Sequence, residues 1–378
     1  MNFGFSEEQE QFREIVRRFA EQRWSLEGVS TLAGSYDCEV YDSKAWQQAS
    51  AELGLAGLLV PERLGGAGFG YLEMGIALEE LGRQLAGGPL WTSACLATGL
   101  LLELADEDAQ SELLPALAAG EQLATVDVAA YLAVASGELP ALEAQPSDDG
   151  GWQIDGSCAH VPFAAQSDLL LLWADHEGDA VLFAVESDAR GLTIKQTSSL
   201  DLTRSVGDLA LSAVPARRLA VAAGKEATAR ALNRARAAMT AEQVGAAAAC
   251  QEQAIAWAIE RIQFSRSIGS FQAVKHRLAD GRLYLELARS AAYWAWWAAD
   301  QGTDENAAEL VEAAPLARSM CCDAFARTAA DLIHLHGGMG FTWEHSAHHY
   351  YRRARAQSVL LGDAQHERQR LADSLLAG

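Results

Sequence analysis

The sequence predicts a mainly α-helical protein with a central β-barrel domain, because three stretches of the chain differ in pattern. Residues 1–120 and 223–378 contain long segments whose apolar residues recur every three to four positions, as in amphipathic helices. Between them, residues 121–222 contain short β-rich runs separated by turn residues. We therefore expect an N-terminal helical domain, a middle β-barrel domain and a C-terminal helical bundle with these boundaries.

The N-terminal domain is expected to begin with a capped helix, since Ser6 and Gln9 have the spacing of a capping box. Its charged, amphipathic start is unlike a signal peptide, and no run reaches the ~18–20 apolar residues of a membrane span. The last helix is expected to be interrupted before Pro115. Helices are predicted over residues 12–24, 43–53, 71–85 and 100–119.

The middle domain is predicted to be a compact antiparallel barrel or sandwich, because its apolar runs are short and regularly spaced. Residues 135–151 are expected to form a surface loop. Strands are predicted over residues 123–128, 152–155, 169–173, 180–185 and 209–214.

The C-terminal part predicts an antiparallel bundle of four long helices. The aromatic group Tyr293, Trp294, Trp296 and Trp297 is expected to pack in the core or at a subunit interface. The helices are predicted over residues 226–263, 270–300, 305–335 and 345–375.

Composition limits the classes of function. The formal net charge of −22 argues against nucleic acid and anionic membrane as partners. The six cysteines show no CxxC spacing and no paired framework, which favours a reducing, cytoplasmic setting. A chain this acidic can bind phosphates only where positive charge is concentrated locally.

Positive charge is concentrated in residues 261–280, which read RIQFSRSIGSFQAVKHRLAD. A helix is expected to end there, break at Ser265–Gly269 and give way to a second helix. Arg261 and Arg266 beside the break suit an anionic, phosphate-bearing ligand, although an ordinary basic loop between helices would read the same way.

The same string resembles the flavin-binding signature of the acyl-CoA dehydrogenase family, in which Arg-x-x-Phe is followed by Gln eight residues after the Phe. The resemblance covers nearly the whole chain. It implies FAD as cofactor, with Arg261 at the pyrophosphate, Phe264 packed nearby and Gln272 at the adenine end. In this family FAD lies across a subunit boundary, and these groups serve the FAD of a neighbouring subunit.

A second family signature, the HGG-x-G turn, occurs within residues 334–340. It implies that His334, Gly337 and Gly338 also contact FAD, with His334 at a position where the family usually has Gln. Adjacent glycines let the backbone approach a ligand closely. The half of the cofactor site that faces a neighbour is therefore complete in this sequence.

The half that would hold flavin within the same subunit is degraded. The family's middle domain carries a T-E-P-x-x-G-S-D segment, whereas residues 124–129 read ATVDVA. The family's W-I-T segment appears as His160-Val161-Pro162, without the aromatic ring and the hydroxyl.

Both positions at which the family places its catalytic Glu are also occupied by other residues. They correspond to Leu361 and to Ala235, the latter just before the family's Arg, here Arg236, which the resemblance marks as substrate-binding. Glu242 is the remaining acidic candidate for the base, because it lies in an apolar helix where an unpaired carboxylate would be costly. The alternative is a structural Glu242 hydrogen-bonded to Arg236 or to the backbone.

Two further groups of residues have side chains that could carry chemistry. Glu344, His345, His348 and His349 have metal-like spacing, but no H-E-x-x-H order exists, so no metal is predicted and solvated or interface histidines are expected. The basic residues Arg352, Arg353 and Arg355 suit either phosphate contacts or a solvated face.

Three functions follow from the resemblance. The preferred one is a subunit of a heteromeric FAD-dependent acyl-CoA dehydrogenase, as in bacterial steroid side-chain degradation, which completes the FAD site of a homologous partner. The alternatives are a self-sufficient homotetramer using Glu242 and a non-catalytic acyl-CoA-binding or assembly protein. The family implies an acyl-CoA substrate and an electron-transferring flavoprotein as electron acceptor.

Overall fold

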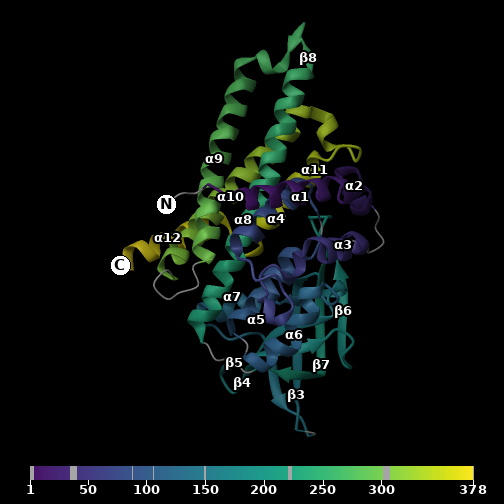
Figure 1. Cartoon of the computed structure of the whole chain (residues 1–378), viewed down its shortest axis with the longest axis vertical. Helices are drawn as coiled ribbons and strands as arrows, with labels where there is room; N and C mark the ends of the chain where they lie inside the picture. Colours follow the sequence, from purple (N-terminus) through teal and green to yellow (C-terminus); the bar gives the residue numbers. More distant parts are fainter. Residues whose placement is uncertain are drawn as a thin grey trace.

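The computed structural model describes residues 4–34, 41–86, 88–104, 106–148, 150–219, 224–300 and 307–377. A β-barrel lies at one end of the long axis, and two long helices project from the other end (Figure 1). The N-terminal helices lie between them. None of the helices in the described part of the chain combines the length and the apolarity that a membrane span requires.

The N-terminal region is helical, as predicted, and the capping box is present, with Ser6 Oγ accepting from the Gln9 backbone N–H at 3.2 Å. The predicted break before Pro115 is wrong. The chain breaks instead ahead of the N-cap Asp106, and Pro115 faces solvent, where water can replace the one lost hydrogen bond. The helices are α1 (Glu7–Arg23), α2 (Leu26–Gly34), α3 (Ser43–Leu53), α4 (Tyr71–Arg83), the π-helix η3 (Leu90–Ala97), α5 (Thr98–Leu104) and α6 (Glu107–Ala119).

The middle region contains the strands β1 (Ala124–Val126), β2 (Leu142–Pro146), β3 (Trp152–Pro162), β4 (Leu169–His176), β5 (Asp179–Glu186), β6 (Leu192–Thr197) and β7 (Val206–Arg218). The pairings β4–β2–β3–β7–β5 return to β4, so these strands close a ring. The predicted barrel is therefore confirmed. It is not purely antiparallel, since β4 pairs in parallel with both β1 and β2.

The predicted surface loop over residues 135–151 is wrong. The segment contains the end of α7 (Val128–Ser136) and the whole of β2. In β2 buried and exposed residues alternate only from Leu142 to Gln145, too short a signal to stand out from the surrounding turn residues.

The C-terminal bundle contains α8 (Lys225–Glu260), α9 (Gln272–Asp300), α10 (Ala307–His336), α11 (Ala347–Leu360) and α12 (Ala364–Ala377). The single helix predicted over 345–375 is wrong, because the chain breaks between α11 and α12 at Gly362, whose φ is 100°. The first residues of the helix predicted over 305–335 lie outside the described residues, as do residues 220–223 at the boundary between the middle region and the bundle. The three domain boundaries stay predictions.

Helix α8 is the axis on which the bundle is assembled, and its small side chains allow close packing. At its crossing with α4, a Cβ added to Gly245 would lie 1.8 Å from the Glu79 carbonyl oxygen. Trp296 of α9 is fully buried and its indole N–H donates to the Thr240 hydroxyl at 3.0 Å, which confirms the core packing predicted for this aromatic side chain. Any side chain larger than hydrogen at Gly245 would separate α4 from α8.

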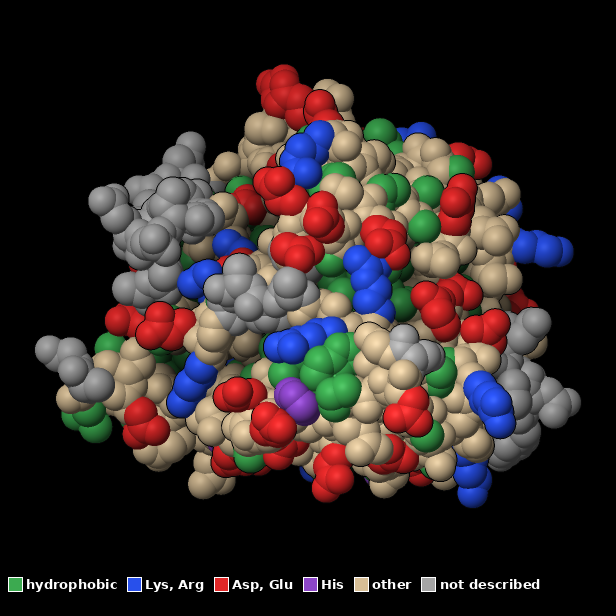
Figure 2. Space-filling view, turned by 90° about the horizontal axis from the view of Figure 1, so that it is seen from below, with side chains coloured by type: hydrophobic (Ala, Val, Ile, Leu, Met, Phe, Trp, Pro, Cys, Tyr) green, Lys and Arg blue, Asp and Glu red, His purple; other side chains and the backbone are tan. Residues whose placement is uncertain are grey.

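Beyond the core, α8 and α9 continue as an antiparallel pair that ends in the short hairpin β8 (Ile262–Gln263) and β9 (Arg266–Ser267). Residues 251–290 are called the arm below (Figure 1). The opposite end of the molecule is covered with dispersed acidic side chains (Figure 2). The basic stretch predicted from the sequence thus lies at the end farthest from that acidic face.

Candidate cofactor and substrate site

The tip of the arm is a strained two-residue hairpin turn rather than an open loop. Phe264 and Ser265 have φ values of 52° and 64°, the left-handed region that side chains other than glycine rarely adopt. The turn leaves Phe264 88% exposed. An exposed phenyl ring on strained backbone suggests a contact surface, because strain of this kind concentrates at functional sites.

Arg261 lies one turn below this tip and is connected to the second signature by stacked rings. Its guanidinium lies 5.6 Å from the ring centroid of Trp257, and Trp257 stacks on His336 with centroids 4.6 Å apart. The Trp257 indole N–H also donates to the Leu335 carbonyl at 2.9 Å. The structure therefore brings Arg261 and the segment 334–340 into one contiguous patch, although they are far apart in sequence.

Gln272 begins α9 on the other side of the hairpin and is exposed, with its amide nitrogen 3.4 Å from the His276 imidazole. Next to it, Phe271 carries the Arg266 guanidinium at 4.0 Å from its ring centroid and contacts Phe264 edge-on at 6.1 Å. Among the described residues, neither Arg261 nor Arg266 forms an ion pair with a carboxylate. Two cations are thus available here for an external anion.

The glycine turn η7 (Gly337–Phe341) is open to solvent. A Cβ added to Gly337 or Gly338 would meet no atom within 4 Å, so space for a ligand lies directly against the backbone. His334 is exposed in the last turn of α10. These groups, together with the arm, fit the phosphate and adenine end of FAD, because they combine unpaired cations, exposed rings and accessible backbone.

The region that would hold flavin inside this subunit is built differently. The Thr125 hydroxyl is fully buried and donates to the Pro162 carbonyl, which joins the two segments where the flavin-contact motifs are missing. Directly after β1, Asp127 caps α7 by accepting from the Ala129 backbone N–H at 3.0 Å. A capped helix therefore occupies the place of a ligand loop, and these residues do not fit flavin.

The two positions that correspond to the family's base lie close together in space. Leu361 is fully buried and its carbonyl accepts from Nε and Nη2 of Arg236, both at 3.3 Å. Ala235, next to Arg236, accepts at its carbonyl from the Trp91 indole N–H at 3.0 Å. Neither side chain can accept a proton, so both places offer only apolar groups.

Glu242 is buried, as expected, but its partners differ from the predicted ones. Its Oε2 atom accepts from the Arg204 guanidinium and from the Gln357 amide, the latter at 2.7 Å. The expected alternative partner, Arg236, is bound elsewhere. A carboxylate oxygen that already accepts from a guanidinium and an amide is poorly available to remove a proton from a substrate.

Arg236 belongs to a different ion pair, with Glu367 of α12 at 3.2 Å, and also donates to Asn233 at 3.1 Å. Burial, followed by repulsion from Arg370, lowers the pKa of Arg236 to about 9. The residue nevertheless lines a cavity of about 590 Å³ between α7, α8 and the α11–α12 junction, together with His366 and Arg370. Arg236 could therefore contact an anionic ligand in this cavity only while it is also bound to Glu367 and Asn233.

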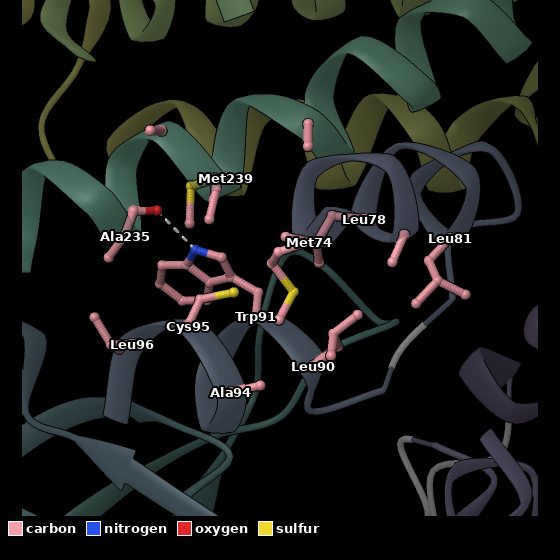
Figure 3. Close-up of a cluster of buried hydrophobic side chains, with 14 of the residues drawn as sticks. Met74, Leu78, Leu81, Leu90, Trp91, Ala94, Cys95, Leu96, Ala235 and Met239 are labelled. Atoms are coloured by element: carbon pink, nitrogen blue, oxygen red, sulfur yellow. Dashed lines mark hydrogen bonds between the residues drawn. The ribbon is translucent and has the colours of Figure 1, made fainter. Parts of the chain in front are cut away.

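The space beside Ala235 is filled by Trp91, which η3 inserts between α4 and α8 (Figure 3). Its ring packs among Met74, Cys95 and Met239 and is 1% exposed. The Arg204 guanidinium lies 5.9 Å from the Trp91 ring centroid. Trp91, Arg204, Glu242 and Gln357 are called the niche below. Arg204 and Gln357 both donate to Glu242, whereas Arg204 Nε and Nη1 and Gln357 Oε1 are buried without a hydrogen-bond partner among the described residues.

Sequence reasoning missed three of the four niche residues. Arg204 lies on the loop before β7, 38 positions from Glu242, and Gln357 is 115 positions away. Trp91 occurs in a run of apolar residues where any large side chain would read as core. An acidic residue in an apolar helix indicates that the carboxylate has a polar partner, but it does not indicate which residue that partner is.

The histidine and arginine groups also differ from expectation. His348 and His349 are buried, so a solvated face is wrong for them, and among the described residues no group of three or more metal-ligating side chains is found. Arg353 is neither solvated nor free for phosphate, because it donates to Asp201 and Thr203 at 3.3 and 3.0 Å and is 1% exposed. Arg352 is partly exposed over the ring of Trp343, and Arg355 is exposed, as a solvated face requires.

Comparison with known families gives two matches. The model for the N-terminal domain of acyl-CoA dehydrogenases matches residues 6–121, and the model for their C-terminal domain matches residues 222–376.

Individual relatives extend this similarity over the whole chain. The chain is 31% identical to the acyl-CoA dehydrogenase IpdE2 of Mycolicibacterium smegmatis, over 97% of this chain and 98% of that protein. A solved variant of the steroid ACAD Tcur3481-Tcur3483 is 31% identical, with a TM-score of 0.84 and 98% of each chain covered. The ChsE4-ChsE5 complex from Mycobacterium tuberculosis is 26% identical, with a TM-score of 0.88 and 100% of each chain covered.

Proposed function

Because the chain belongs to the acyl-CoA dehydrogenase family of FAD-dependent oxidoreductases, we propose that it is the non-catalytic subunit of a heteromeric acyl-CoA dehydrogenase. In this proposal its arm and its glycine turn hold the pyrophosphate and adenine end of FAD bound mainly by a homologous partner subunit. FAD would supply the hydride acceptor for α,β-dehydrogenation of an acyl-CoA thioester. The partner would supply the carboxylate base.

One observation carries this proposal: the FAD-facing groups point outward while the chain's own base positions hold only apolar side chains. Arg261 and Phe264 are exposed at the tip of a projecting arm, far along α8 from the niche. If the chain had simply decayed from an active enzyme, substitutions would be expected at the outward-facing FAD-binding residues as well as at the base positions. Complementation of a second subunit accounts for both regions.

The names of the relatives favour a particular setting. Two solved neighbours are complexes named with two different components, and one is named a steroid ACAD. We therefore propose a steroid-type acyl-CoA as substrate of the complex. A cytoplasmic location and an electron-transferring flavoprotein as electron acceptor belong to the same proposal.

The proposal is tested by purifying the chain alone and together with a family member from a neighbouring reading frame that carries T-E-P-x-x-G-S-D and a Glu base. Flavin absorbance, native mass and turnover of an acyl-CoA are measured for both preparations. We expect flavin and turnover only in the complex. Stoichiometric FAD with turnover in the lone chain would exclude the non-catalytic role.

Arg261→Ala separates the arm's contribution from general loss of assembly. A hydrogen bond to a charged group is worth about 1.5–3 kcal/mol, so we expect the FAD affinity of the complex to fall about 10- to 100-fold. The matched control is Arg282→Ala on α9 of the same arm, where the arginine pairs with Glu286 at 2.9 Å. The control should leave FAD affinity unchanged, and equal losses in both variants would contradict a specific role for Arg261.

The self-sufficient alternative makes the opposite prediction for Glu242. If Glu242 were the base, Glu242→Gln would abolish turnover and retain FAD. Under our proposal, turnover by the complex persists in any folded Glu242→Gln preparation.

A second candidate, acyl-CoA binding without catalysis, is favoured by the cavity that Arg236, His366 and Arg370 line. Cationic side chains beside an apolar wall suit a thioester ligand that carries phosphates. Calorimetric titration of the lone chain with butyryl-CoA tests this function. Binding that Arg370→Ala weakens would support it, and absence of heat at millimolar ligand would exclude it.

A further inference from the structure

The histidines at the base of the glycine turn form one cluster. The rings of His336 and His345 have centroids 4.3 Å apart, and those of His348 and His349 are 4.0 Å apart. His345 lies close enough to both His336 and His348 for a charge on either to act on it. The edge of Trp343 closes the cluster over His348 at 5.0 Å.

The imidazole rings of two of these histidines have no hydrogen-bond partner in the described part of the chain. His348 is 6% and His349 is 1% exposed, and neither ring nitrogen of either residue is hydrogen-bonded. Buried polar groups are usually hydrogen-bonded. A neutral imidazole can tolerate such surroundings, but an imidazolium would lose its hydration without compensation.

The charged groups that face the cluster would not stabilise a protonated imidazole. On α11 itself these are Arg352 and Arg353, and the glycine-turn side contributes His336. From the loop before β7 comes Asp201, whose carboxylate is already bound by Arg353 and by the Thr203 backbone N–H at 2.9 Å. Burial and then the neighbouring His348 and Arg352 lower the pKa of His349 to about 4, and burial also lowers the pKa of His348 and of His345.

We propose that this cluster is an acid-sensitive latch, which holds the segment 337–346 against α10 and α11 while its imidazoles are neutral and releases it when they are protonated. The segment is suited to local opening, because it is short and Met339, Phe341 and Trp343 are already exposed. The consequence of opening rests on the proposed function: a released turn would no longer present Gly337 and Gly338 to FAD.

The direction and size of the effect follow from the lowered pKa. The open state, in which His349 is released, binds more protons than the closed state between the ordinary pKa of 6.5 and about 4. Closure is therefore fully favoured above pH 6.5 and is lost as the pH falls toward 4. For His349 alone, lowering the pH from ~7.5 to ~5.5 should increase the opening equilibrium about 10-fold.

Hydrogen exchange of the lone full-length chain, followed by mass spectrometry, tests the latch. Exchange of the amides in 337–346 is measured at the two pH values and corrected for the chemical rate at each pH. We expect about 10-fold loss of protection in the wild type and a much smaller loss in His349→Gln. His160→Gln, at an exposed position on β3, is the matched control and should behave as the wild type.

Protection that is equal at both pH values, or equally pH-dependent in wild type and His349→Gln, would overturn the proposal. If His349→Gln does not fold, exchange of the imidazole C2 hydrogen in the wild type measures the pKa of His349 directly, and ordinary titration near ~6.5 would overturn it as well. Neither partner nor FAD is present in these measurements. A chain that opens with acid but never forms a flavin-containing complex with a homologous partner would keep the latch and exclude the subunit role.

Discussion

The arm, to which we assign contacts with FAD, and the niche beside the family's two base positions are opposite in physical character. On the arm, Arg261 and Phe264 are exposed, and the glycine turn beside them has open space against its backbone. In the niche, Arg204 and Gln357 both donate to Glu242 beside the Trp91 ring. A region that binds a partner keeps polar groups at the surface, whereas the niche holds its polar groups in the interior.

This difference separates two ways in which a residue can be important. Niche residues are expected to determine the stability of the lone chain, because they lie in the interior and their contacts are made within the chain. Arm residues are expected to affect only the complex, because their contacts are made with another molecule. Stability measurements on single variants can therefore test whether the two regions differ in this way.

Trp91→Ala should have the largest effect on the lone chain. The indole is 1% exposed and donates to the Ala235 carbonyl, so the variant loses buried apolar surface and a hydrogen bond and leaves a cavity. We expect the free energy of unfolding to fall by about 3–5 kcal/mol, measured by urea denaturation. Trp343→Ala, at a ring that is 53% exposed, serves as the control and should cost clearly less.

If the two substitutions lowered the free energy of unfolding equally, the side chains around Trp91 would not be close-packed. A further measurement sharpens this result. If the cavity left by Trp91→Ala binds flavin or acyl-CoA, the closed niche would be one substitution away from a ligand site.

Glu242→Ala should follow with a smaller cost of about 3 kcal/mol, because removing one partner leaves the Arg204 guanidinium in a mostly buried place without a counter-charge. Glu242→Gln keeps an acceptor for Arg204 and should cost less. The measurement is again urea denaturation of the lone chain. If Glu242→Ala left the free energy of unfolding unchanged, the ion pair with Arg204 would not stabilise the niche, and a functional role for Glu242 would again have to be considered.

The sequence predicted the arm better than the niche, and the reason is physical. Arg261, Phe264 and Gln272 lie within twelve residues, so a local string was sufficient to mark them, and the helical and β patterns placed that string between two bundle helices. The strained hairpin itself was not foreseen, since Phe264 and Ser265 carry no residue preference for positive φ.

The niche could not be predicted because it depends on contacts between distant segments. Nothing near Arg204 in the sequence indicates that its guanidinium reaches α8, and Glu242 could equally have paired with Arg236 on its own helix. The same limit applies to the histidines of α11, whose polarity suggests solvent while their packing against Trp343 and the loop at Asp201 buries them.

Phe264→Ala should have the smallest effect on the lone chain and therefore tests the comparison from its other side. The ring is 88% exposed and contacts only Phe271 within the described aromatic contacts, so the free energy of unfolding should change by no more than about 0.5 kcal/mol. In the complex, the same variant should lower FAD occupancy, measured by flavin absorbance per subunit. Substitution by Gly separates the ring from the strained backbone, because Gly adopts positive φ without cost while losing the ring equally.

If Phe264→Gly and Phe264→Ala reduce FAD occupancy alike, the ring provides the contact and the strain only presents it. If Phe264→Gly retains FAD and Phe264→Ala does not, the geometry of the turn matters more than the phenyl group. A loss of lone-chain stability comparable to that of Trp91→Ala would contradict the division itself, since an exposed arm residue would then be part of the structural core.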